Sequence, residues 1–153
     1  MVRVVATGVF DLIHLGHVHF LEKAKDLGDE LVVIVARDST AKKMKHQPIT
    51  PEGMRVELVQ ALKPVDRAVL GYEDDIFRII TEVRPDIIAL GYDQTFKEDD
   101  LRKELKKRNL QIKVVRLPHL DHDLDGTRKI IRKIIDWNAA QQKLKEAEGV
   151  KKR

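Results

Sequence analysis

The chain has 153 residues, which is enough for one domain with a single sizeable hydrophobic core. Hydrophobic residues make up 42% of the chain and charged residues 35%, which excludes a disordered or membrane-spanning protein. There is no cysteine, which excludes disulfides, thiolate metal sites and thiol nucleophiles. The chain opens directly on an apolar run and lacks a signal-peptide pattern, so we expect a cytoplasmic protein with no membrane partner.

The net charge of +4 is unevenly distributed along the chain. Residues 128–153 hold nine lysines and arginines against three acidic residues, whereas residues 1–127 are close to neutral. The sequence therefore predicts one domain over residues 1–145, followed by a basic tail over residues 146–153. Because the excess of positive charge is confined to the end of the chain, we expect no nucleic-acid partner, and an RNA-binding arm over residues 143–153 stays an alternative.

Apolar runs alternate with amphipathic stretches along the chain. Five runs are candidate strands, at residues 3–6, 31–36, 67–70, 86–90 and 112–116, and three of them are rich in Val and Ile and nearly continuous, as buried parallel strands are. Helical patterns occupy residues 17–27, 51–62, 73–83 and 98–108, and a last helix runs from Gly126 or Thr127 to about Leu144. The alternation predicts a single Rossmann-like α/β domain: an open parallel sheet of five strands in the order 3-2-1-4-5, with helices on both faces.

Local signals set the expected ends of these elements. Gly28 is predicted to cap the end of the first helix, and Thr50 is predicted to cap the start of the second, with Pro51 at its first position. Residues 42–49 are basic and aperiodic, so they are predicted to form a loop.

The first predicted strand leads into residues 7–17, which read Thr-Gly-Val-Phe-Asp-Leu-Ile-His-Leu-Gly-His. His14 and His17 flank Gly16 where the chain turns into a helix, and Gly16 lets a ligand come close because it has no Cβ. A helix N-terminus presents free N–H groups and the positive end of its dipole, which suits phosphate. Two imidazoles beside it can donate hydrogen bonds to phosphoryl oxygens as charge builds on them. The turn is therefore a candidate site of phosphoryl chemistry.

Within this turn, the pattern Gly-x-Phe-Asp-x-x-His-x-Gly-His resembles the signature of the nucleotidyltransferase superfamily, and most closely its cytidylyltransferase-type branch. The resemblance covers roughly residues 1–135. It implies that His14 and His17 are catalytic and bind the nucleotide phosphates, and that Asp11 is orienting or close to a metal. The nucleotide-binding candidates of the turn are Thr7, Gly8, Val9, Phe10, Asp11, His14, Gly16 and His17.

A basic segment follows the second predicted strand. A cluster of lysines at positions 42, 43 and 45 reads by itself as a solvated charge run. The resemblance implies instead a clamp on the triphosphate, in which Lys43 and Lys45 match the spacing best and Lys43 is catalytic. Arg55 matches a phosphate-binding arginine of the family, with an ordinary helix-surface arginine as the alternative.

The turn after the fourth predicted strand contains Gly91, Asp93 and Gln94. Strands one and four are neighbours where the predicted winding reverses, and ligands in open α/β sheets bind at that point. We therefore expect this turn to face the crevice of the two histidines, and the resemblance implies contacts with base and ribose. Metal-ligating residue types occur in the segment 119–123, which we interpret as a polar loop.

Thr127 opens the last predicted helix and is a capping residue by default. The resemblance implies that its hydroxyl contacts a phosphate. His119 follows Leu-Pro at a place where relatives often have arginine, so it is either a substitute for that contact or a sign that the contact is missing.

Residues 28–38, 62–66 and 85–94 are similar to archaeal FAD synthases, the FMN adenylyltransferases. This resemblance implies that AMP passes from ATP to FMN by direct in-line displacement, giving FAD and diphosphate, with Mg²⁺ or another divalent cation bridging phosphates. A glycerol-3-phosphate cytidylyltransferase is the alternative reaction, and a non-catalytic nucleotide sensor is the alternative from another class. Relatives are often homodimers, so a homodimer is an expectation for which the sequence specifies no interface.

Overall fold

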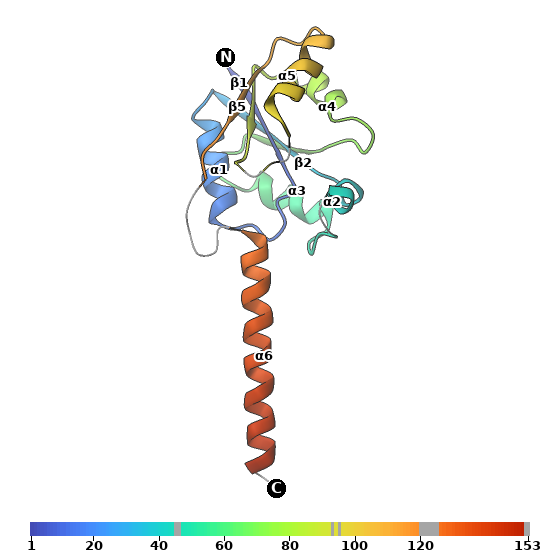
Figure 1. Ribbon diagram of the computed structural model, residues 1–153. Helices are drawn as coiled ribbons and strands as arrows, with labels where there is room; N and C mark the ends of the chain where they lie inside the picture. Colours follow the sequence, from blue (N-terminus) through green and yellow to red (C-terminus); the bar gives the residue numbers. More distant parts are fainter. Residues whose placement is uncertain (45–46, 93, 95, 120–125, 152–153) are drawn as a thin grey trace.

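The structure is a computed structural model that describes residues 1–44, 47–92, 94, 96–119 and 126–151 (Figure 1). Five strands form one sheet in the order β3-β2-β1-β4-β5, and every neighbouring pair is parallel, so the predicted fold class and strand order are confirmed. The strands are β1 (Arg3–Gly8), β2 (Glu30–Val35), β3 (Arg67–Leu70), β4 (Ile87–Leu90) and β5 (Lys113–Arg116).

Six helices occupy the described residues. They are α1 (Leu15–Lys25), α2 (Asp38–Met44), α3 (Glu52–Gln60), α4 (Ile76–Val83), α5 (Glu98–Lys107) and α6 (Thr127–Lys151). Two of them differ from expectation. The first part of the predicted 42–49 loop belongs to α2, which is too short for helical periodicity to be visible in the sequence. Helix α6 continues to Lys151, past both its predicted end and the expected domain boundary at residue 145.

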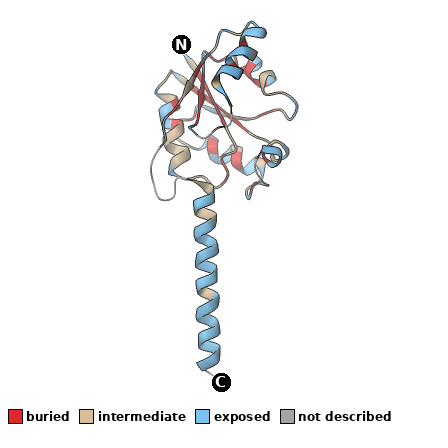
Figure 2. Cartoon of the chain, in the orientation of Figure 1, coloured by how far each residue is buried: buried red, intermediate tan, exposed pale blue. Residues whose placement is uncertain are grey.

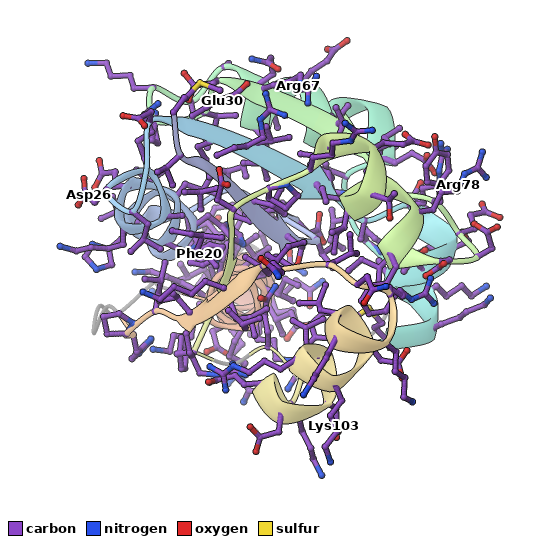
Figure 3. All side chains as sticks on the ribbon, turned by 90° about the horizontal axis from the view of Figure 1, so that it is seen from above. Phe20, Asp26, Glu30, Arg67, Arg78 and Lys103 are labelled. Atoms are coloured by element: carbon purple, nitrogen blue, oxygen red, sulfur yellow. The ribbon has the colours of Figure 1, made fainter. Side chains whose placement is uncertain are left out.

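Alternating side chains of the central strands divide the core between the two faces of the sheet. Val4 and Ala6 of β1 pack in a cluster with residues of α1 and α3. Val5, between them, packs in a second cluster with residues of α4 and α5. Because both faces of the central strands are covered, the middle residues of these strands form nearly continuous apolar runs, as buried parallel strands do. Seen from above, charged side chains such as Asp26 and Lys103 lie around the outside of these layers (Figure 3).

Two predicted capping residues act differently in the structure. Helix α1 ends at Lys25 with Asp26 as its C-cap residue, and Gly28 is needed for close approach instead, because a Cβ there would lie 2.7 Å from the Val2 carbonyl oxygen. Pro51, with φ −67° and ψ 155°, is the N-cap residue of α3, and no side chain caps that helix. Thr50, the expected cap, turns its hydroxyl to Asp11. Both predictions of these caps were wrong.

Helix α6 projects from the body of the domain (Figure 1) and is exposed along nearly all of its length (Figure 2). None of its 25 residues is buried. Its first turn nevertheless contacts the domain, because the Thr127 hydroxyl donates a hydrogen bond to the Asp11 carbonyl. Across the part of the chain that the structure describes, a helix with the length and apolarity to span a bilayer is not found.

Candidate active site

A cavity of about 700 Å³ opens at the carboxyl ends of the parallel strands, where ligands bind in open α/β sheets. Its walls come from the β1–α1 turn, from residues that follow each of the other four strands, and from the first turn of α6. The volume is within the range of small-molecule and cofactor pockets. The predicted convergence of the β1 and β4 turns on one crevice is therefore what the structure shows: His14, His17, Gly91 and Gln94 all line it.

The two histidines of the β1–α1 turn stack on each other at the start of α1. Their ring centroids are 3.8 Å apart, with 27° between the planes. His14 is the N-cap residue, and its Nδ1 accepts a hydrogen bond from the Gly16 backbone N–H at 3.0 Å. The His17 Nδ1 accepts from the His14 backbone N–H at 3.3 Å. The pair thus forms a capping box of the kind usually made by Ser or Thr with Glu or Gln.

These two hydrogen bonds select the tautomer of each ring. A neutral imidazole carries one N–H donor and one acceptor, so a ring whose Nδ1 accepts carries its proton on Nε2. Both His14 and His17 line the cavity. Each ring can therefore offer its Nε2–H to an oxygen bound in the cavity, while its Nδ1 holds the helix N-terminus. Fixing a ring through one nitrogen so that the other can act is a common way to position histidine.

The backbone before the histidines adopts an unusual conformation. Phe10 has φ 56° and Leu12 has φ 50°, the left-handed region that side-chain-bearing residues seldom occupy. Such residues cost of order 1–3 kcal/mol each and persist where surrounding contacts determine them. Gly8 permits this path, since a Cβ there would lie 2.9 Å from the Phe10 ring. Phe10 itself is buried in the core cluster, so its ring anchors the turn.

Asp11 ties the turn to the segment that precedes α3. Its carboxylate accepts hydrogen bonds from the backbone N–H groups of Ile49 and Thr50 at 2.8 and 2.9 Å and from the Thr50 hydroxyl at 2.7 Å. Burial acts to raise the pKa of Asp11, but the hydrogen bonds from Thr50 and Ile49, together with the charge of Arg55, hold that pKa below its usual range. In this geometry Asp11 orients the β1–α1 turn by holding it against residues 49 and 50.

Arg55 is completely buried, unlike the surface arginine that the sequence left open. Its Nε donates to the Thr50 carbonyl at 3.0 Å, and its terminal nitrogens donate to the Val9 carbonyl at 2.6 Å and to the Asp38 carboxylate at 2.7 Å. Among the described residues that line the cavity, Arg55 is absent. In this conformation it therefore fastens the β1 turn from behind, and its predicted contact with a phosphate stays a prediction.

The remaining predicted residues divide into two groups. Thr7, Gly8, Val9, Gly16 and Thr127 line the cavity, as do Phe10 and Asp11. Lys43 lies exposed on α2 and outside the described cavity wall. Lys45, Asp93 and the loop residues 120–125 lie outside the described residues, so the predictions for them stay predictions.

Gln94 and Thr127 each donate a hydrogen bond to a backbone carbonyl of β1 or of the turn that follows it. The Gln94 amide donates to the Thr7 carbonyl at 2.6 Å and accepts from the Gly91 N–H at 3.0 Å, which fixes the β4 turn against β1. The Thr127 hydroxyl donates to the Asp11 carbonyl at 2.6 Å, which places the start of α6 beside the same turn.

Sequence reasoning missed Arg37 and Arg116 near the cavity, and it named His119 but not its contact with Tyr92. Arg37 follows β2 and lines the cavity. Arg116, the last residue of β5, donates to the carbonyl oxygens of Gly91 and Gln94 at 2.7 and 3.2 Å and so supports the β4 turn. His119 packs against Tyr92 with ring centroids 4.0 Å apart. The available signal for all three was a charged or aromatic residue at the end of a buried strand or shortly after it.

Comparison with known proteins places this chain. The cytidylyltransferase-like family model matches residues 5–146. An FAD synthase of Aciduliprofundum boonei is 60% identical over 137 residues, covering 89% of this chain and 92% of that protein. An FAD synthase of Ferroglobus placidus is 54% identical, with 94% of each chain covered.

Solved structures agree with the sequence comparison. A crystal structure from Thermoplasma volcanium, described as a lipopolysaccharide core biosynthesis protein, superposes with a TM-score of 0.78 at 53% identity, covering 79% of this chain and 99% of that one. The sequence match, the superposition and the strand order all indicate the same family, and so do the paired histidines at a helix N-terminus that suits phosphate. The chain belongs to the cytidylyltransferase-like family of nucleotidyltransferases.

Proposed function

We propose that this protein is an FAD synthase, which transfers AMP from ATP to FMN and releases diphosphate. The observation that carries the proposal is the pair of cavity-lining imidazoles whose Nδ1 atoms hold the start of α1. The identity of 50–60% to proteins named FAD synthase, over most of both chains, supports ATP and FMN as the substrates.

The reaction is a single displacement at the α-phosphorus of ATP. An oxygen of the FMN phosphate forms a bond to that phosphorus, and the bond from the same phosphorus to the bridging oxygen breaks, so diphosphate leaves with the bonding electrons. Negative charge grows on the oxygens around the phosphorus and on the leaving group. The Nε2–H donors of His14 and His17 stabilise that charge, and they need no reorganisation because α1 already fixes both rings.

The outer phosphates have a second source of positive potential. The first turn of α6 lines the cavity with Thr127, Arg128 and Lys129, and the N-terminus of a helix favours anions. Lys43 and Lys45 are proposed to add positive charge beside the β- and γ-phosphates. Positioning and charge stabilisation then account for the catalysis, as in phosphoryl transfer generally.

The side chains around the cavity suit Mg²⁺ that is carried mainly by the substrates. The described residues contain no group of three or more His, Asp or Glu side chains close enough together to hold a metal ion. Mg²⁺ retains several waters and binds nucleotide phosphates with few protein ligands, so such a cavity fits it. When bound, the ion would neutralise charge on the phosphates, and Asp11 would orient the turn beside it through its bonds to residues 49 and 50.

An acceptor panel tests the proposal. Purified protein is given ATP or CTP with FMN, glycerol 3-phosphate or phosphopantetheine, and diphosphate release is followed continuously. We expect release with ATP and FMN and formation of FAD. Release with CTP and glycerol 3-phosphate would identify the alternative cytidylyltransferase, and nucleotide binding without release from any pair would identify a sensor. The panel has added value because the Thermoplasma volcanium relative is described by a different process.

A further inference from the structure

Arg37 is a cavity residue that the family motif does not include. It lies just after the end of β2, separated from it by Ala36, so it is at the carboxyl end of the sheet on the β2–β3 side of the β1 turn. The turns after β4 and β5 lie on the other side of β1. The histidines of the β1–α1 turn therefore stand between Arg37 and the nucleotide-binding candidates Gly91 and Gln94 along the row of strand ends.

The guanidinium of Arg37 is held at two of its nitrogens. Its Nε donates to the Gly71 carbonyl at 2.7 Å, and one terminal nitrogen donates to the Glu52 carboxylate at 3.1 Å. About a third of the side chain, 35%, is exposed. A guanidinium has five N–H donors in a fixed planar fork, and within the described part of the chain these two are assigned partners. The fork is thus pre-oriented, with donors left for a ligand.

Positive charge enters the cavity from two directions. Among the described arginines and lysines that line it, Arg128 and Lys129 belong to the first turn of α6, and Arg37 stands apart from them at the end of β2. The Thr127–Asp11 bond places the α6 group next to the β1 turn. A reaction between two phosphate-bearing substrates needs two anion positions, and the cavity has two groups of cations.

In-line displacement requires the attacking oxygen and the leaving oxygen to lie on opposite sides of the α-phosphorus, so the two phosphates need separate cations. The α6 group lies next to the histidine turn through the Thr127–Asp11 bond, and we assign the outgoing diphosphate to it. Arg37 stands apart at the end of β2, which leaves it for the phosphate of the acceptor. We propose that Arg37 binds the phosphate group of FMN and aims its oxygen at the α-phosphorus. This assignment rests on the proposed function.

Thr40 supplies a second observation on the same wall. Its Oγ1 is the buried side-chain polar atom, within the described residues, that lacks a hydrogen-bond partner. Thr40 lies on α2, three residues after Arg37, and both line the cavity. An unsatisfied buried hydroxyl costs about 1–3 kcal/mol, so structures seldom retain one without a use. A phosphate oxygen bound beside Arg37 is an acceptor of the kind that this hydroxyl lacks.

The experiment compares two flavins that differ in the phosphate alone. FMN and riboflavin are titrated into the protein, with and without a non-hydrolysable ATP analogue, and flavin fluorescence gives each dissociation constant. Arg37→Gln should weaken FMN about 10- to 100-fold, the range for losing a charge-assisted hydrogen-bonding pair, and should change riboflavin less than twofold. In steady state the KM for FMN should rise while the KM for ATP stays unchanged.

Arg102→Gln is the matched control, because Arg102 is a half-exposed arginine on α5 that also bonds to a carboxylate and a carbonyl. It should leave both flavin affinities unchanged. Equal weakening of FMN and riboflavin by Arg37→Gln would overturn the proposal in favour of a shaping part, and a changed KM for ATP alone would assign Arg37 to the triphosphate. If the wild type neither binds FMN nor uses it, the proposed FAD synthase activity is refuted independently of Arg37. The same comparison is then made with the acceptor that proves active and with its dephosphorylated form, which tests Arg37.

Discussion

Helices α1 and α6 both bring their N-termini to the cavity, and they are held there in different ways. Helix α1 begins on a two-histidine capping box and buries Leu21 and Ala24 against the sheet. Helix α6 buries none of its residues, and the Thr127 hydroxyl ties its first turn to the Asp11 carbonyl. The groups assigned to the reacting phosphorus thus stand on the packed helix, and the groups assigned to the leaving phosphates stand on the projecting one.

The difference shows which part of the site is held most rigidly. The β1 turn contains two left-handed residues and is fastened by Arg55 at Val9, by Asp11 to residues 49 and 50, and by Thr127 at Asp11. Catalysis by preorganised donors requires the donors to be fixed before the charge develops. The start of α6 can be positioned less exactly, because the positive potential of a helix N-terminus can stabilise a leaving diphosphate without fixed hydrogen-bond geometry.

The largest expected effect on this difference comes from removing Arg55, whose hydrogen bonds hold the β1 turn. Arg55→Ala deletes a buried guanidinium and leaves the Val9 and Thr50 carbonyls and the Asp38 carboxylate without it. Losing one partner of a buried ion pair costs roughly 3–5 kcal/mol. We expect that loss in the free energy of unfolding measured in urea. Arg102→Ala, which removes three exposed or half-exposed contacts on α5, should cost about 1 kcal/mol or less; equal losses would show that the turn does not depend on Arg55.

His17→Ala tests the packed helix at the level of chemistry. Removing one preorganised donor typically lowers kcat about 100- to 1000-fold, and losing one half of the capping box should cost about 1 kcal/mol of stability. Turnover from diphosphate release and stability from urea unfolding separate the two effects. In His17→Gln the side-chain oxygen can take over the cap, so this variant should regain stability and stay slow. A kcat within tenfold of wild type for His17→Ala would contradict the assigned part.

Asp11→Asn sharpens the comparison through pH. The pKa of Asp11 is lower in the folded protein than its ordinary value of 3.8, so the carboxylate stabilises the fold fully above that value. The contribution is lost as the pH falls below 3.8 and through the lower folded pKa, because the proton then binds the unfolded chain first and the folded chain last. We expect Asp11→Asn to be less stable than wild type at pH 7 by about 1–3 kcal/mol.

Urea unfolding at a series of pH values measures that gap, which should close as acid protonates the wild-type carboxylate. Asp26→Asn, an exposed carboxylate at the end of α1, is the control and should stay close to wild type at neutral pH. A gap between Asp11→Asn and wild type that persists at the acid end would mean that the fold depends on the side chain's shape and not on its charge.

The sequence was sufficient for the parts of the fold that depend on pattern. Val- and Ile-rich runs separated by helical periods predicted all five strands and their order, since buried parallel strands and right-handed crossovers leave few other arrangements. The spacing of His14 and His17 predicted a helix start that the structure confirms. These features are local or follow from general rules of topology.

What the sequence could not predict depends on contacts between distant residues. Arg55 has the same neighbours in sequence whether it is exposed or buried, and its partners Val9 and Asp38 lie 46 and 17 residues away. Arg37 became a candidate only when β3 brought the Gly71 carbonyl beside it. Lys43 was assigned by resemblance to a lysine pair of the family, and that resemblance does not reveal which side of the short helix α2 faces the cavity.

Thr127→Val makes the smallest change and tests the projecting helix directly. Valine keeps the shape of threonine but cannot donate to the Asp11 carbonyl, and one such hydrogen bond contributes about 1 kcal/mol. Because α6 has no buried residue to hold it otherwise, that loss should appear in the placement of its first turn. We expect the KM for ATP to rise about threefold to tenfold, with faster hydrogen exchange at the start of α6, while the KM for FMN stays the same. Thr127→Ser retains the donor and should behave as wild type. If Thr127→Val leaves both the KM for ATP and the exchange unchanged, α6 is positioned by contacts other than this bond, and the two helix starts are more alike than their burial indicates.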